Sequence, residues 1–268
     1  AGYVQGQVTL WDRLTLVGGG RVDDHSRFGD HSTGQASAAY VLRSTGTTLR
    51  AGYGTAFRAP SMNQLFRPGS GNPNLRPERS RSVEAGVEQA LWEKQFHISA
   101  TYFHTRFTDL IDFGPPPSFQ SLNIDRAQAE GVELLAEIRP IKGLLFRGGY
   151  TFTEAIDSNT QQPLRRRPKH LGSASATYEF DKQYSVSVSG LFVGRRFDTD
   201  PVAFGRAENG GYAKFDLAAA ATLAERWGPV SAVRLTAKIE NLLDKQYDEA
   251  LGFPALGLTY LVGIEANF

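Results

Sequence analysis

Cysteine is absent from the 268-residue chain, methionine occurs once, and no long apolar run is present. The lack of cysteine excludes disulfide bonds, thiolate nucleophiles and cysteine-ligated metals. A membrane-spanning helix needs about 18 consecutive apolar residues, and no segment approaches that length. The mean hydropathy is −0.32 and the net charge is +1, so the sequence shows no broad electrostatic preference for nucleic acid or acidic lipid. A membrane protein of this composition has to cross the bilayer with strands, in which only alternate residues face lipid.

Alternation of apolar and polar residues is the dominant pattern along the chain. Around 231–243, for example, Val233, Leu235 and Ile239 occupy one phase and Arg234 and Lys238 the other. Such a period of two predicts β-strands, and helical periodicity is nowhere sustained. The predicted strands are 1–11, 14–24, 33–43, 48–57, 79–92, 94–107, 119–139, 144–155, 168–180, 184–197, 211–224, 231–243 and 258–268.

The connections between these segments alternate between short and long. The short turns are predicted at 11–13, 44–46, 93–94, 140–143, 181–183 and 226–229. The long polar loops are predicted near 25–32, 58–78, 108–118, 156–167, 198–210 and 244–257. This regular sorting is typical of a transmembrane barrel, which has tight periplasmic turns and larger extracellular loops. A soluble β-sandwich has no reason to adopt it.

The number of strands indicates which phase faces outward. Thirteen or more strands closed into one barrel leave a lumen too wide for side chains to fill, so its lining should be polar. The apolar phase then faces lipid, and it carries aromatic residues that suit a girdle at the membrane interface. These aromatic residues are Tyr40, Tyr53, Tyr102, Tyr150, Tyr178 and Phe180. We therefore predict an all-β fold, an antiparallel transmembrane β-barrel.

Three segments resemble the TonB-dependent outer-membrane receptors. Residues 49–87 contain FRAP, then NPNLRPE, then SVEAGV; residues 123–133 read NIDRAQAEGVE; and residues 240–247 read ENLLDKQY. The chain also ends on Phe268, which is similar to the C-terminal signal of outer-membrane barrels. Among the members of the family, the sequence looks most similar to receptors for vitamin B12 and siderophores.

The resemblance implies a TonB-binding box, a globular plug and a 22-stranded barrel, and the sequence contains neither box nor plug. Its thirteen strands would be about strands 10–22 of such a barrel. The turn at 11–13 is short and hence predicted to be periplasmic, so the first strand starts outside the cell, unlike that of a complete even-stranded barrel. We expect one domain, 1–268, that begins in mid-barrel: a proteolytic fragment, one half of a split chain, or part of a longer polypeptide. The missing strands and plug are then partners, from the same or a separate chain.

By this resemblance the function is uptake of a large, scarce nutrient across the outer membrane of a Gram-negative bacterium, energised by the TonB complex through the absent box. Cobalamin, a siderophore and another metal chelate are the candidate nutrients. A passive pore built from a shorter barrel is the alternative, and a soluble enzyme is a distant third. We expect no resident cofactor and no nucleic-acid partner, and no nucleophile–base pair with supporting context suggests catalysis.

Candidate site residues lie in the predicted extracellular loops, because loops on a rigid scaffold often bind ligands. The ligand-binding candidates are Arg58, Asn63, Phe66, Arg67, Tyr247 and Phe253. A basic run could grip phosphates of lipopolysaccharide through charge-assisted hydrogen bonds, or it could be a solvated rim. Its members are Arg165, Arg166, Arg167 and Lys169. The acidic and histidine residues at 23–31 match no known ligand spacing, so we predict no metal site.

Overall fold

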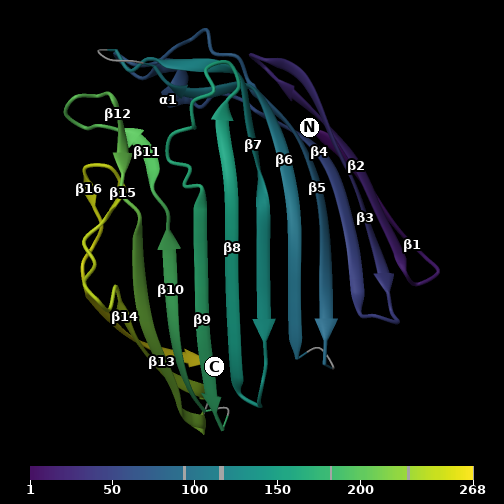
Figure 1. Cartoon of the computed structure of the whole chain (residues 1–268), viewed down its shortest axis with the longest axis vertical. Coiled ribbons are helices and arrows are strands. Elements are labelled where there is room, and N and C mark those ends of the chain that lie inside the picture. Colours follow the sequence, from purple (N-terminus) through teal and green to yellow (C-terminus); the bar gives the residue numbers. More distant parts are fainter. Residues whose placement is uncertain (93–94, 115–117, 182, 228–229, 268) are drawn as a thin grey trace.

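The computed structural model describes residues 1–92, 95–114, 118–181, 183–227 and 230–267. Within them, one curved 13-stranded antiparallel sheet dominates, accompanied by two small hairpins and one short helix, α1 (Met62–Phe66) (Figure 1). The strands of the large sheet are β1 (Gly2–Leu10), β2 (Leu14–His25), β3 (Gly29–Leu42), β4 (Thr47–Arg58), β5 (Glu78–Leu91), β6 (Phe96–Phe113), β7 (Ser121–Ile138), β8 (Leu144–Asp157), β9 (His170–Phe180), β10 (Tyr184–Val193), β13 (Tyr212–Trp227), β14 (Val230–Glu240) and β17 (Thr259–Asn267). No helix of the described residues is long and apolar enough to cross a membrane.

The strands of the large sheet follow one another in chain order, each antiparallel to the next. The hairpin of β11 (Arg196–Thr199) and β12 (Arg206–Asn209) lies between β10 and β13 in the sequence. The hairpin of β15 (Asp248–Ala250) and β16 (Phe253–Pro254) lies between β14 and β17. The thirteen predicted strands are thus confirmed one by one. β17 pairs with β14, and the described residues contain no pairing between β17 and β1, the two edges of the sheet.

Two predicted loops are wrong in extent. The predicted loop 25–32 is mostly strand, because β2 and β3 stay paired up to His25 and Gly29 and only 26–28 turn. Likewise β6 runs on to Phe113, although 108–118 was predicted as loop. In both places the alternation that reveals a strand is lost, because 25–32 is mostly polar and 108–113 reads TDLIDF. The loop 58–78 contains α1, and 244–257 contains the second hairpin. The first hairpin begins at Arg196, within the predicted strand 184–197, and continues through most of the predicted loop 198–210.

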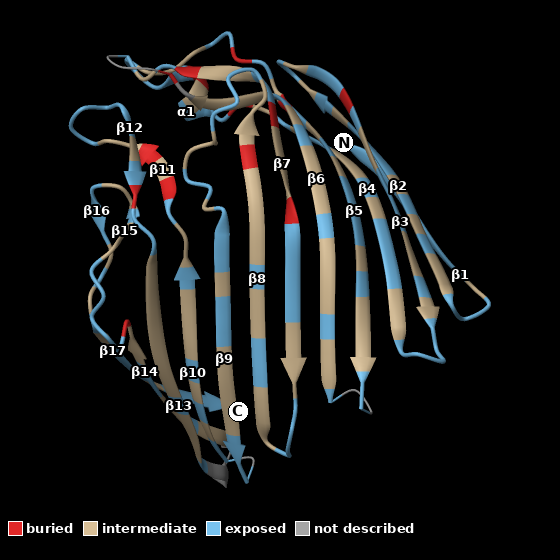
Figure 2. Cartoon of the chain, viewed as in Figure 1, coloured by how far each residue is buried: buried red, intermediate tan, exposed pale blue. Residues whose placement is uncertain are grey.

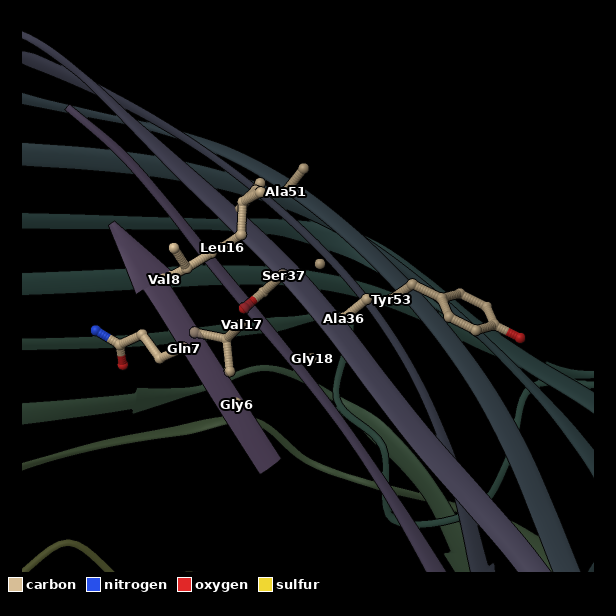
Figure 3. A pocket seen from close by; sticks show the side chains of 12 residues that line it. Gly6, Gln7, Val8, Leu16, Val17, Gly18, Ala36, Ser37, Ala51 and Tyr53 are labelled. Carbon is tan, nitrogen blue, oxygen red and sulfur yellow. The ribbon is translucent and has the colours of Figure 1, made fainter. Parts of the chain in front are cut away.

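The sheet has an apolar face and a polar face. Cross-strand partners such as Leu49 and Val87, or Ala100 and Leu134, share the apolar face. Figure 3 shows that Leu16 and Ala51 point to one side of the sheet, whereas Val17 points to the other, toward the green C-terminal strands. The apolar face is therefore the outer side of the curve. Large apolar side chains remain exposed along it in almost every strand, a surface that marks contact with a membrane or another protein.

The polar face lines the concave side with paired charges. Glu88 lies between Arg50 and His97, within 2.5 Å of a nitrogen of each. Arg147 Nε donates a hydrogen bond of 2.8 Å to Glu137 Oε2. These residues, together with Ser173 and its neighbours, line a hollow of about 620 Å³ that extends from β4 to β9. The charges of this group thus pair with one another.

Candidate functional site

Buried side chains gather at the end of the sheet that carries the long loops. We call this the loop end and the opposite one, with the tight turns, the turn end. The buried apolar residues of the described chain are Leu65, Leu75, Ala127 and Ala155, and all lie in the loops or the strand segments nearest them. Figure 2 shows the buried segments concentrated at this end, around α1, β7, β8, β11 and β12. The loop end is therefore packed and ordered by its own contacts.

The segment after β4 begins with a capped helix. The Ser61 hydroxyl accepts a hydrogen bond from the Gln64 N–H, and the Gln64 side chain accepts one from the Ser61 N–H, so two backbone donors at the helix start are satisfied. Leu65 is buried beneath the helix. The Asn72 amide then donates to the Ser121 carbonyl at 2.9 Å, which ties the loop to the start of β7. The sequence NPNLRPE therefore fixes the position of the loop.

Charged residues of the same loop complete this attachment. Arg76 donates to Asp109 of β6 at 2.8 Å and to Asp125 of β7 at 3.0 Å. Glu78 accepts a hydrogen bond from the Ile111 N–H at 2.8 Å and forms an ion pair with Arg58. Arg58, a ligand-binding candidate, thus has a structural partner.

The other candidates of this loop lie at its surface. Phe66 is half exposed, and the Arg27 guanidinium stands 5.1 Å from the centre of its ring. Asn63 and Arg67 are exposed on and just after α1, where Asn63 accepts the Arg67 N–H through its carbonyl. The structure therefore brings Phe66 together with a cation, Arg27, that was not predicted as a site residue. Its signal was the cation and aromatic pair Arg27-Phe28 in the tight β2–β3 turn.

A second buried cluster connects the two small hairpins. Asp198 of β11 is fully buried; it accepts from Arg166 Nε at 2.8 Å, from the Thr199 N–H at 2.8 Å and from the Leu251 N–H at 3.0 Å. Arg196 donates to the carbonyls of Asp248 and Glu249 at 2.7 and 2.8 Å. Burial alone would raise the pKa of the Asp198 carboxyl, but these donors outweigh it, and the pKa lies below its ordinary value. The hairpins are thereby held as one unit by an ionised carboxylate.

Tyr247 and Phe253 differ in what they offer a ligand. The Tyr247 ring stacks on Tyr212 with centroids 4.0 Å apart, so it packs against β13. Phe253 is 68% exposed in β16 and remains available for contact. Asn241 explains the ENLLDKQY motif: its buried amide donates to the carbonyls of Lys245 and Leu256 at 3.0 and 3.3 Å and shapes the loop.

The basic run 165–169 is divided among different partners. Arg166 binds the buried Asp198, Lys169 lies 2.6 Å from Glu154, and Arg165 lies 3.9 Å from Asp112. Arg167 is exposed and donates to the Arg166 carbonyl. Part of this run therefore has a structural role, and lipopolysaccharide binding by it stays a prediction.

Ring contacts between distant loops were also not predicted. Phe119, just before β7, meets Phe204 of the β11–β12 hairpin edge to face, with centroids 4.9 Å apart. Neither residue belongs to a pattern that sequence alone distinguishes from an exposed loop aromatic. No group of three or more histidine and carboxylate residues in the described chain is arranged to hold a metal ion.

Close packing between strands accounts for the family-like segment 123–133. Ala127 is buried, and a Cβ on Gly131 would lie 1.9 Å from the Phe152 carbonyl oxygen of β8. Only glycine therefore fits position 131 without a shift of the backbone.

Comparison with solved structures relates this fold to outer-membrane receptors. The ferric enterobactin receptor PfeA of Pseudomonas aeruginosa, as a G324V mutant, superposes with a TM-score of 0.80, at 20% identity over 99% of this chain and 44% of that one. The copper transporter OprC gives 0.78, at 19% identity over 98% and 46%. The siderophore receptor PirA of Acinetobacter baumannii gives 0.79, at 18% identity over 99% and 45%. The chain thus has their fold and spans less than half their length.

A family model gives the assignment. The model described as "TonB dependent receptor-like, beta-barrel" matches residues 1–242, most of the chain. Barrels of this family lie in the Gram-negative outer membrane, and their members are transporters rather than enzymes. The chain belongs to the TonB-dependent receptors and forms part of their β-barrel.

Proposed function

We propose that the chain is the C-terminal part of the barrel of a receptor that imports a siderophore or another metal complex, with energy supplied through TonB. The observation that carries the proposal is the family match to residues 1–242 together with a barrel wall whose edges, β1 and β17, have no partner across the gap within the described residues. Of the nutrients predicted from sequence, cobalamin has no counterpart among the named relatives. PfeA, PirA and OprC favour a siderophore or copper instead.

The unpaired edges imply further strands in the complete receptor. Each backbone N–H or C=O left without a partner in the hydrocarbon region costs several kcal/mol. The first nine barrel strands and the plug are the partners that would satisfy β1 and β17 and fill the polar concave side. The Glu88 and Glu137 clusters would then face the plug.

The nutrient would meet the loop end first. Phe66 with Arg27 above it, and the exposed Phe253, offer aromatic surface and positive charge to an anionic, aromatic metal chelate. Arg67 and Asn63 adjoin Phe66 and could extend that contact, whereas Arg58 and Tyr247 would support the loops.

Uptake by the complete receptor tests this function. The receptor is expressed in a strain without its own siderophore receptors, and import of radiolabelled ferric siderophores, copper and cobalamin is measured with and without TonB. We expect TonB-dependent import of one metal complex and none of cobalamin. Import that persists without TonB would contradict the proposal.

A matched pair of variants tests the loop contact. Phe66→Ala should weaken nutrient binding about tenfold, the usual loss for a truncated aromatic anchor. Met62→Ala, which removes another exposed apolar side chain from the same helix, should leave binding unchanged. Equal losses for both variants would indicate damage to α1 instead of a direct contact.

The passive pore remains the second candidate, because the concave face is polar. It predicts a large, steady conductance when the complete protein is inserted into a planar bilayer. A plugged receptor should conduct little under the same conditions.

A further inference from the structure

Four exposed arginines lie on the outer face of the sheet, beyond the apolar band toward the loop end. Arg79 and Arg81 belong to β5, Arg106 to β6 and Arg126 to β7. Arg81 is directly opposite Arg106 in the pairing of β5 with β6. Thr108 is opposite both Arg79 and Arg126, so the four positions form one patch across three strands, here called the arginine patch.

The register places this patch on the lipid-facing side. In β5 the pairing runs without a shift from Arg79 to Leu91, so Arg79 and Arg81 share the face of Val83 and Val87. Arg106 shares the face of Tyr102 by the same count. Arg81 and Arg79 are two and four residues beyond Val83, the last large apolar residue of this face in β5, which corresponds to roughly 7–13 Å along the strand. The guanidinium groups are therefore expected at the level of the lipid headgroups.

The charges of the patch are not neutralised by the protein. Among the described residues no ion pair involves Arg79, Arg81, Arg106 or Arg126, and Arg106 Nε instead donates to His104 Nε2 at 3.1 Å. Glu130, one row lower on this face, accepts from Tyr102 and His104, each at 3.2 Å. Like charges on directly opposite residues destabilise a sheet, so the pair Arg81 and Arg106 needs an anion between them.

Several arginines on the concave side of the sheet, in contrast, form ion pairs. Arg50, Arg58, Arg76 and Arg147 each contact a carboxylate there. These four arginines thus have carboxylate partners within the described chain, which the arginines of the patch lack.

A groove adjoins the patch. Its volume is about 630 Å³, and Arg79, Arg81, Arg106 and Thr108 line one side of it. Phe57 and Thr55 of β4 line much of the rest, where the pairing of β3 with β4 has ended at Gln35 and Gly54. Residues 30–33 of β3 form the opposite side of the groove, and they place one carboxylate, Asp30, across from the arginines. The groove thus combines guanidinium donors with an apolar ring on the side of the protein that meets the outer leaflet.

We propose that the arginine patch binds a phosphate group of an outer-leaflet lipid headgroup, of the kind lipopolysaccharide carries. A guanidinium fork matches the geometry of a phosphate and donates two parallel hydrogen bonds to it. The phosphate lies between Arg81 and Arg106 and relieves their repulsion, while the acyl chains of the same lipid extend along the apolar face below. This site is separate from the basic run 165–169, and it depends on the outer-membrane placement but not on the imported nutrient.

Binding of purified lipid to the complete receptor in detergent tests the site. Native mass spectrometry and titration compare the wild type with Arg81→Gln/Arg106→Gln, using phosphorylated lipid A, enzymatically dephosphorylated lipid A and inorganic phosphate as probes. The matched control is Arg13→Gln/Arg43→Gln, which removes two exposed arginines at the turn end. Heat-modifiable migration on gels verifies that each barrel is folded.

The test variant should bind phosphorylated lipid A about 30-fold more weakly, while the control binds like the wild type. Wild-type affinity should also fall when salt is raised or the lipid is dephosphorylated, a result that does not require the variant to fold. Unchanged binding by the test variant overturns the site. Equal binding of dephosphorylated lipid overturns phosphate recognition, and tight binding of inorganic phosphate alone overturns the lipid as its source. Nutrient import is measured in parallel, so failure here is separable from failure of the proposed function.

Discussion

The two ends of the barrel wall are stabilised in different ways. At the turn end, each connection is short and its backbone packs against the neighbouring strand: Gly46 and Gly143 have φ angles of +69° and +84°, and a Cβ on either would lie within 2.6 Å of a carbonyl oxygen of Ala90 or Glu179. At the loop end, the connections are long, and buried polar side chains hold them in place. Asp198 binds Arg166 and Leu251, which are 32 and 53 positions away.

The difference shows where specificity can change without loss of the barrel. Between the two ends, the strands require only alternation and regular pairing. The loops that would contact a nutrient are held in place by a few polar side chains, among them Asp198, Asn72 and Asn241. The exposed residues of these loops can therefore vary without a change in the position of the loops.

The largest effect is expected in the wall between the ends. Leu134→Arg places a charge on the apolar face and should destabilise the barrel by about 2–4 kcal/mol if it lies near the bilayer midplane. Leu135→Arg is a matched control, because Leu134 and Leu135 are 44% and 48% exposed and point to opposite faces. Unfolding titrations of the complete receptor in lipid vesicles provide the free energies. Similar losses for both variants would contradict the assignment of the faces.

A smaller, local effect is expected at the loop end. Asp198→Ala leaves Arg166 and the N–H groups of Thr199 and Leu251 without their acceptor. Each buried donor left unpaired costs about 1–3 kcal/mol, so both hairpins should exchange amide hydrogens faster while the strands do not. Glu208→Ala removes a half-exposed carboxylate of the same hairpin and serves as control. Faster exchange throughout the wall would show that the two ends are not independent.

Acid should destabilise the β11–β12 hairpin by a smaller amount than Asp198→Ala does. The pKa of Asp198 lies below its ordinary value of 3.8, and the N–H groups of Ala203 and Val202 lower the pKa of Asp200 likewise. A carboxyl whose pKa falls on folding stabilises the folded state above pH 3.8 and loses that contribution as pH drops through the lowered pKa. Protection factors, which correct for the slower intrinsic exchange in acid, should therefore fall at 198–203 before they do in the strands as the pH drops through and below 3.8. Acceleration on going to higher pH, beyond the intrinsic rate, would refute this sign.

The smallest effect is expected at an exposed ion pair near the loop end. Lys169→Ala removes the 2.6 Å contact with Glu154, and both side chains are more than 40% exposed. Exposed pairs contribute about 0–1 kcal/mol, so the unfolding free energy should barely change. A loss above that range would assign this pair a structural role like that of Arg166.

Sequence predicted the wall well because alternation is a local pattern that lipid imposes. All thirteen strands were predicted, and the strict alternation from Val233 to Ile239 is an example of the pattern. The upper parts of β2, β3 and β6 were missed because residues 25–32 and 108–113 do not alternate, although the strands stay paired there.

The loop end was predictable only as a region. The β11–β12 and β15–β16 hairpins depend on Arg196 and Asp198, whose partners are fixed by the tertiary fold. Nothing in the segment RRFDTD distinguishes a buried carboxylate from a solvated one. The ligand-binding candidates were chosen by residue type, and the structure divides them into supports, such as Arg58, and exposed groups, such as Phe66.

The order of strands along the sheet also bears on how the wall forms. Because each strand pairs with the one before it, every hairpin closes a short stretch of chain and loses little loop entropy. Contacts of such low sequence separation favour rapid, stepwise zippering in which each new strand finds its template already in place. The slow event is then the single long-range one, the meeting of the first and last strands of the complete barrel. The rate of assembly is then set by the pairing of these two strands.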